Sequence, residues 1–139
     1  MSTEHNREIF RRIVDQGLNE RDEKVLDEAF GDTLIDHDLP PGTPPGPAGT
    51  KAKIAYFVSA FPDVTFTFES DVAEGDRIAG RGYFTGTHRG DFQGIAPTGK
   101  RVKVDFQDVW RFEDGKVVEY WGAPDLLGLL RQLGALPPP

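Results

Sequence analysis

The sequence has 139 residues, no cysteine and a formal net charge of −7 at pH 7, with 28% charged and 37% hydrophobic residues. This composition is typical of a single globular domain (1–139), and the acidic balance argues against nucleic-acid partners, which need a basic surface. The lack of cysteine excludes disulfides and thiolate metal sites, and the lack of a long apolar segment leads us to expect a cytoplasmic protein without a membrane partner.

Three helices are predicted in the first sixty residues. Apolar residues recur at helical spacing from about Thr3 to Asn19. A second helix is predicted from Asp22 to Phe30, with Asp22 as the N-cap and Gly31 as the C-terminal stop. A third is predicted from Thr50 to Phe61, ended by Pro62.

The segment between the second and third helices is predicted to be extended and then irregular. A brief extended piece, Thr33 to Asp38, precedes LPPGTPPGPAG, in which five prolines and three glycines exclude regular structure. Both flanks look structured, so we interpret this segment as a rim loop or lid rather than a disordered linker.

From Asp63 onward the periodicity changes to that of strands. Val64, Phe66 and Phe68 alternate with polar residues, and a second strand is predicted from Arg77 to His88. A hairpin beginning near Lys100 turns at 113–116, and a short helix begins near Asp125. The pattern predicts an α+β fold: a curved antiparallel sheet wraps on N-terminal helices, a C-terminal helix caps it, and the cone-shaped cavity is suited to a small molecule.

A lone carboxylate on an apolar strand face is the main candidate for chemistry. With period-two alternation, Asp108 shares a face with Phe106 and Trp110. If it is buried there, its pKa rises and it becomes a base that works near neutral pH. The alternative is a structural ion pair with a cavity arginine such as Arg81.

Other polar residues have a functional and a structural interpretation each. His37 either exchanges protons at neutral pH or only bonds the backbone at the cavity mouth. Tyr120 either donates a hydrogen bond to a developing oxyanion or fills the core. Arg81 either binds a substrate carboxylate or balances Asp108. Trp121 falls on the opposite strand face from Tyr120, and His88 is expected to be exposed. Adjacent strand residues alternate in direction, so Asp-His-Asp at 36–38 does not predict a metal site.

Several motifs in order resemble the SnoaL-like polyketide cyclase family of the NTF2-like superfamily. They are PGTPPGPAG, FPDV at 61–64, VAEGDRIAGRGYFTGTHRGDFQGIAPTGK at 72–100 and WRFEDGKVVEYWGAPDLLGLLRQLG at 110–134. The resemblance implies a cone fold with a deep pocket, a homodimer, and aldol ring closure of a polyketide ester without a metal or organic cofactor.

The same resemblance implies altered chemistry in the pocket. The family's general acid/base is an Asp on the last strand, two residues after a His. Counting back from Asp125 places Gly122 and Tyr120 at those positions. On the preceding strand, Phe106 and Asp108 stand where the cyclases have a Gln and a His.

We therefore expect a cofactor-free enzyme that moves protons on an apolar, oxygenated small molecule, by cyclisation or isomerisation. Its expected catalytic residues are Asp108, His37 and Tyr120, and its expected substrate-binding residues are Arg81, Phe106, Trp110, Phe57 and Gly122. Two alternatives remain: a non-catalytic ligand-binding or dimerisation module, since a fold hosts many functions, and an epoxide or ester hydrolase. The hydrolase requires a second pocket carboxylate, such as Asp36 or Asp38, near Asp108.

Overall fold

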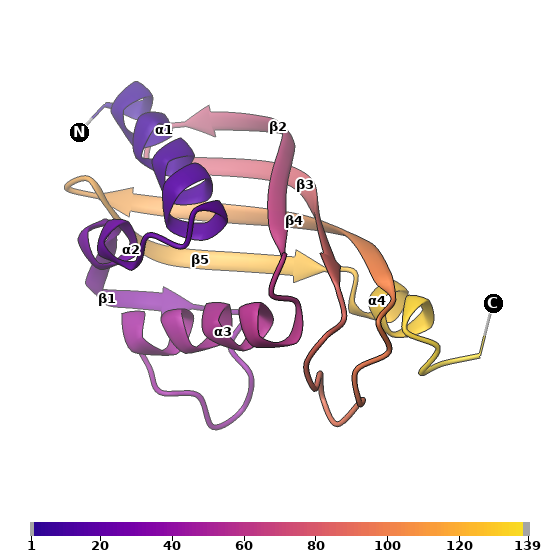
Figure 1. Cartoon of the computed structure of the whole chain (residues 1–139). Coiled ribbons are helices and arrows are strands. Elements are labelled where there is room, and N and C mark those ends of the chain that lie inside the picture. Colours follow the sequence, from indigo (N-terminus) through magenta and orange to yellow (C-terminus); the bar gives the residue numbers. More distant parts are fainter. Residues whose placement is uncertain (1, 138–139) are drawn as a thin grey trace.

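A computed structural model describes residues 2–137 and shows one face of a curved five-stranded sheet covered by helices (Figure 1). The elements, in chain order, are α1 (Thr3–Arg12), the π-helical segment η1 (Ile13–Asn19), α2 (Glu23–Ala29), β1 (Phe30–Asp36), α3 (Pro47–Ala60), β2 (Thr65–Glu74), β3 (Arg77–Thr87), β4 (Arg101–Glu113), β5 (Lys116–Pro124) and α4 (Leu126–Gln132). This α+β architecture, with its C-terminal helix, confirms the predicted fold class. No helix in residues 2–137 has the length and apolar character needed to cross a membrane.

The sheet is mixed rather than wholly antiparallel, which corrects the prediction at one edge. Its strand order is β1-β5-β4-β3-β2, and β2 to β5 are antiparallel neighbours as predicted. β1 pairs with β5 in parallel. A strand that reaches the sheet without a hairpin to its neighbour is free to run in either direction, and β1 is joined to the sheet through α3 and β2 to β4. β1 also begins earlier than predicted, because Gly31 lies within the strand, close to the Val118 side chain, instead of ending α2.

The first predicted helix reaches Asn19, but its second half is π-helical. The N–H of Glu20 bonds to the carbonyl of Asp15 five residues earlier. At Gly17 an added Cβ would lie 2.6 Å from a Leu26 methyl group, so α2 packs directly against the glycine. Such π segments are common near functional sites, and two η1 residues, Ile13 and Leu18, line the cavity described below.

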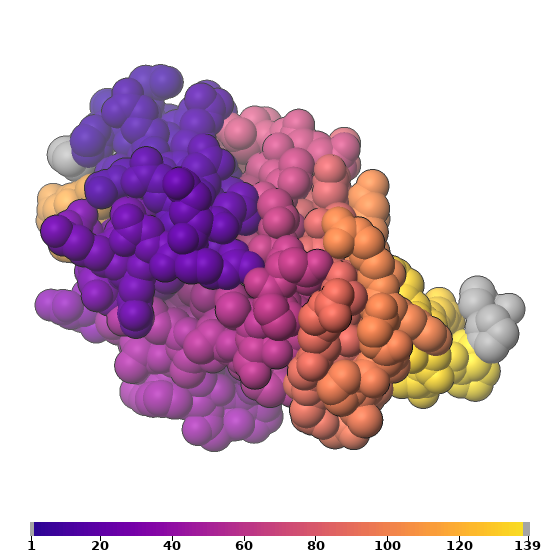
Figure 2. Space-filling model, in the orientation of Figure 1, coloured from indigo at the N-terminus to yellow at the C-terminus, as the bar shows by residue number. Residues whose placement is uncertain are grey.

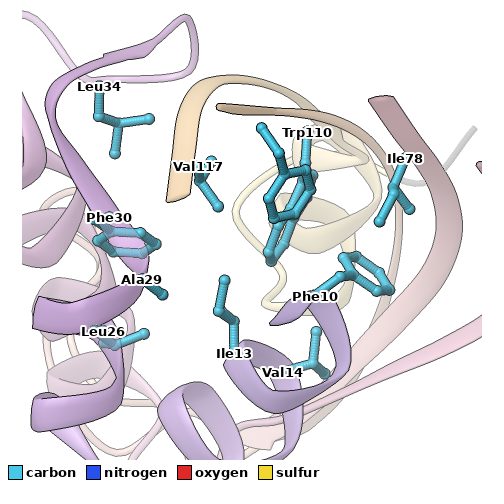
Figure 3. Packing of buried hydrophobic residues seen from close by; sticks show 11 residues of the cluster. Phe10, Ile13, Val14, Leu26, Ala29, Phe30, Leu34, Ile78, Trp110 and Val117 are labelled. Carbon is cyan, nitrogen blue, oxygen red and sulfur yellow. The ribbon is translucent and has the colours of Figure 1, made fainter. Parts of the chain in front are cut away.

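The buried face of β4 alternates as predicted and joins two apolar clusters. In the cluster of Figure 3, Phe10 of α1 packs edge-to-face on Trp110 of β4 with ring centroids 4.7 Å apart. Ile13 and Leu26 from the helical layer face Val117 from the sheet in the same cluster. The second cluster lies toward α4 and contains Phe61, Phe84, Phe92, Val102, Val104, Phe106 and Leu129. The space-filling view shows α1, α2 and α3 covering this side of the sheet (Figure 2).

His88 is fully buried, which contradicts the expectation that it is exposed. The loop after β3 folds back on α3, and the N–H groups of Arg89 and Gly90 both bond to the Ala60 carbonyl. The His88 ring lies 5.5 Å from the Phe61 ring, and its Nδ1 accepts the backbone N–H of Thr98. The sequence pattern could not show that this loop packs on a helix.

Candidate functional site

A cavity of about 120 Å³ lies between the helical layer and the inner face of the sheet. Its walls are mainly apolar, and many are aromatic: Ile13, Leu18, Phe30, Leu34, Ile54, Phe57, Phe66, Phe68, Phe84, Phe106, Trp110, Val117 and Pro124. Its polar lining consists of Asp38, Thr50, Lys53, Asp108 and Tyr120. Because one water needs only about 10–15 Å³ of such space, the cavity has room for a small organic molecule.

Two glycines determine the surroundings of Asp108. Gly80 of β3 and Gly122 of β5 lie opposite it in register on the two neighbouring strands. A Cβ at Gly80 would lie 2.6 Å from the Phe68 ring, and a Cβ at Gly122 would collide with the Tyr120 hydroxyl. The glycines therefore let an aromatic ring and a phenol lie against the sheet on either side of the carboxyl.

The Asp108 carboxyl is a weak acid in this environment. Asp108 is 9% exposed. Burial raises its pKa from 3.8 to about 7, and the nearby Tyr120 hydroxyl, Trp110 indole N–H and Lys53 ammonium offset only part of this rise. The indole N–H has no hydrogen bond of normal geometry within residues 2–137, so its contact with the carboxyl is loose. Asp108 can therefore both accept and return a proton near neutral pH.

Tyr120 remains a hydrogen-bond donor at the same pH. Burial raises the pKa of its hydroxyl well above the ordinary value, and the carboxyls of Asp108, Asp38 and Asp36 add to the rise. A protonated phenol beside a base can donate to an oxygen that gains negative charge.

A buried ion pair connects α3 to β1 at the polar side of the cavity. Lys53 Nζ lies 2.8 Å from Asp36 Oδ2, and the Asp36 side chain is completely buried. Asp36 also accepts the Thr50 hydroxyl and the Asp38 N–H, each at 2.8 Å. Burial raises the pKa of Asp38, and Lys53, 3.7 Å from its carboxyl, partly offsets this rise.

Comparisons with known proteins identify the family of this chain. The family model described as SnoaL-like polyketide cyclase matches residues 8–133. The chain belongs to this family.

Solved structures with the same fold include three from Streptomyces. TsrD from Streptomyces laurentii is 31% identical, with a TM-score of 0.88 over 98% of this chain and 99% of its own. AclR from Streptomyces galilaeus, described as a proposed hydroxylase, is 31% identical, with a TM-score of 0.85 over 99% of this chain and 89% of its own. IdmH from Streptomyces antibioticus, described as a proposed polyketide cyclase, is 29% identical, with a TM-score of 0.81 over 93% of this chain and 98% of its own. No curated protein matches the sequence.

The structure brings most of the predicted site residues of this cyclase-family chain to one cavity. Asp108, Tyr120, Phe106, Trp110 and Phe57 all line it. Gly122 does not line it, because the Tyr120 hydroxyl covers its inner side, and Gly122 borders a groove on the outer face of the sheet instead. Its role is to make room for Tyr120 rather than to contact a substrate.

His37 lies away from the cavity, contrary to its predicted role. Its ring stacks on Trp121 with centroids 5.0 Å apart, and its Nε2 lies 2.7 Å from Glu119 Oε2 on the outer face of the sheet. The physical reason is alternation at the end of β1: Asp36 points inward, so His37 points outward. His37 therefore has no part in the proposed chemistry.

Arg81 does not pair with Asp108, and the cation near this carboxyl is Lys53. Arg81 lies on the outer face of β3, with its NH1 atom 3.4 Å from Glu69 Oε1. Lys53 is not among the residues predicted from the sequence, although one signal was present. Lys53 is four residues before Phe57 and therefore lies on the same face of α3. Within residues 2–137, no group of three or more His, Cys, Asp or Glu side chains is placed to hold a metal.

We predict that Asp108→Asn changes how stability depends on pH. The folded protein holds the Asp108 proton up to about pH 7, whereas the unfolded chain releases it near pH 4, so wild-type stability falls as pH rises between these values. The free energy of unfolding in urea is measured from pH 4 to pH 8. Over this range the Asn variant should become more stable relative to wild type by on the order of 4 kcal/mol. Asp105→Asn, exposed on the other face of β4, is the control. A constant difference across this range would contradict the burial of the charge.

We also predict that Asp36→Ala strongly destabilises the protein, because it leaves the Lys53 ammonium, 12% exposed, without its buried partner. The free energy of unfolding in urea should fall by about 3–5 kcal/mol. Asp27→Ala is the matched control: it breaks the more exposed pair of Asp27 on α2 with Lys51 on α3 and should change stability little. Equal losses in the two variants would refute the structural role of the buried pair.

Proposed function

We propose that the protein is an acid–base enzyme that removes a proton next to a carbonyl group in an aromatic, oxygenated small molecule. The product is then a new ring, as in a polyketide cyclase, or an isomer. One observation carries the proposal: a carboxyl with a pKa of about 7 is buried in an aromatic cavity beside a protonated phenol. Membership of the SnoaL-like family supports it. The cytoplasmic location remains a prediction from the sequence.

The proposed steps use only groups of this chain. The ionised Asp108 accepts a proton from the carbon next to a carbonyl, and the electron pair of the broken C–H bond moves onto the carbonyl oxygen as an enolate. In ring closure, the enolate carbon forms a C–C bond to a second carbonyl of the same molecule. The resulting alkoxide takes back the proton from Asp108, while Tyr120 donates a hydrogen bond to the oxygen that carries the charge. In isomerisation, Asp108 returns the proton to a different carbon.

One observation favours a second candidate, hydrolysis of an epoxide or ester. Asp38 lines the same cavity as Asp108, which meets the requirement for a second carboxyl, whereas Asp36 is engaged by Lys53 and Thr50. In this candidate, one carboxylate accepts a proton from water, and the other carboxyl, protonated, donates to the leaving oxygen.

Exchange of hydrogen for deuterium in α-tetralone, a fused aromatic ketone, tests the first candidate. Wild type should catalyse exchange at the carbon next to the carbonyl, measured by proton NMR, and the rate should rise with pH through about 7 as Asp108 ionises. Asp108→Asn should lower the rate by about 10²–10⁴-fold, while Asp105→Asn should leave it unchanged.

Other outcomes separate the alternatives. Hydrolysis of styrene oxide that requires both Asp38 and Asp108, without exchange, would favour the hydrolase. Binding of aromatic ligands with neither activity would favour a non-catalytic module. Exchange that survives in Asp108→Asn would reject Asp108 as the base.

We further propose that the protein is a homodimer that pairs through the outer face of the sheet. Val72, Ala79, Val109 and Trp121 lie opposite one another in register across four strands. They form an apolar row on the face away from the helices. Val72 is 70% exposed and the other three are half-buried. A contiguous apolar patch that solvent reaches is typical of a protein–protein interface.

Sedimentation velocity at micromolar concentration tests this pairing. Wild type should sediment as a dimer, and Val72→Arg, which places a charge in the apolar row, should weaken the dimer at least tenfold. Glu8→Arg on exposed α1 is the control and should remain dimeric. A monomeric wild type, or a Val72→Arg dimer as tight as wild type, would reject the outer face as the interface.

A further inference from the structure

We propose that Lys53 is a further catalytic residue, whose ammonium binds the substrate oxygen that becomes negative when Asp108 takes the proton. The inference rests on the proposed function. In this arrangement, Lys53 on α3 stabilises the enolate, and Asp108 on the sheet is the base that generates the enolate. It also specifies the substrate as an enolisable aromatic ketone whose carbonyl oxygen points toward α3.

The position of Lys53 supports this role. Its Nζ lies 4.6 Å from the centre of the Tyr120 ring, above the phenol that flanks Asp108. Lys53 and Asp108 line the same cavity and come from its opposite walls, α3 and β4. Lys53 is also the one cationic side chain in the cavity lining formed by residues 2–137. A substrate held between them therefore meets a base on one side and a cation on the other.

The ammonium is held in place before any substrate arrives. It donates to Asp36 Oδ2 at 2.8 Å and to the Asp38 carbonyl at 3.4 Å. Asp36 is itself fixed by the Thr50 hydroxyl and the Asp38 N–H. An ammonium has three N–H donors. The third faces the Asp38 carboxyl at 3.7 Å, beyond normal hydrogen-bond length, so this donor can bind a substrate oxygen. A donor that is already positioned needs no reorganisation when charge develops.

The movement of charge during the step favours this arrangement. Before proton transfer, the negative charge is on Asp108; afterwards Asp108 is neutral, and the charge is on the enolate oxygen. The total charge of the cavity does not change, but the negative charge moves toward Lys53. An interaction that strengthens along the reaction accelerates it, whereas one that is equal in both states only tightens binding.

The walls of the cavity favour an aromatic substrate. Phe57 lies on the same α3 face as Lys53, and Phe106 and Phe68 lie on the sheet beside Asp108. A planar ring can pack among these side chains with its oxygen directed to the polar side. 1-Naphthol has this shape and is an aromatic analogue of the enol of α-tetralone, so its ionised form imitates the enolate.

The pKa of bound 1-naphthol tests the inference without turnover. The naphtholate absorbance is titrated at saturating protein, in wild type and in Asp108→Asn, where ionisation of Asp108 makes no contribution. In each of these two backgrounds, removing the Lys53 charge should raise the pKa of bound naphthol by at least one unit. One unit is a tenfold change in the ionisation constant of naphthol.

Two variants remove the charge, so that misfolding does not decide the result. Lys53→Met leaves the buried Asp36 without its cationic partner, whereas Lys53→Met combined with Asp36→Asn removes both charges and keeps an acceptor for the Thr50 hydroxyl. Circular dichroism checks that each variant folds. Lys51→Met, two residues away on the surface of α3, is the matched control and should titrate like wild type.

Kinetics give a second readout. If Lys53 acts mainly after charge has moved, the double variant should lower kcat for exchange about 100-fold or more with little change in KM. The inference is overturned if bound naphthol has the same pKa with and without the Lys53 charge, or if the folded wild type does not bind naphthol. Those results leave the Asp108 test intact, because loss of exchange in Asp108→Asn is measured separately.

Discussion

Burial of one carboxyl on the inner face of β4 is the constraint on which the site depends. Asp108 can lie there because the neighbouring strands carry Gly80 and Gly122 opposite it, which leaves space for Phe68 and Tyr120 on either side. The aromatic surroundings remove water from the carboxyl and raise its pKa to about 7. The same aromatic side chains form the walls of the cavity, so the feature that makes Asp108 a weak acid also makes the cavity apolar.

The second constraint is the buried ion pair of Lys53 with Asp36, which joins the helical layer to the edge strand. This pair holds α3 against the inward-pointing Asp36, and alternation along β1 then directs His37 outward. Asp38, whose carboxyl lies 3.7 Å from Lys53 Nζ, lines the cavity beside this pair. The polar side of the site is therefore built from two elements that are distant from Asp108 in the sequence, and a cation and an acid face the same space.

The pairing of Gly122 with Asp108 has a structural explanation. Gly122 on β5 carries no side chain, and the Tyr120 hydroxyl occupies the space that one would need. Asp108 lies opposite Gly122 in register on β4. The acid/base that we propose therefore comes from β4 and not from the last strand.

The sequence by itself determined the elements, the strand faces and the family. Alternation along β4 predicted that Phe106, Asp108 and Trp110 share the buried face, because side-chain direction in a strand is a local property. Tertiary structure decided which side chains meet across elements. Four features depend on contacts between distant segments. They are the parallel pairing of β1, the packing of the loop that buries His88, the position of Lys53 instead of Arg81 near Asp108, and the outward direction of His37. Local periodicity carries no information about such contacts, because it describes each element separately and not how the elements pack together.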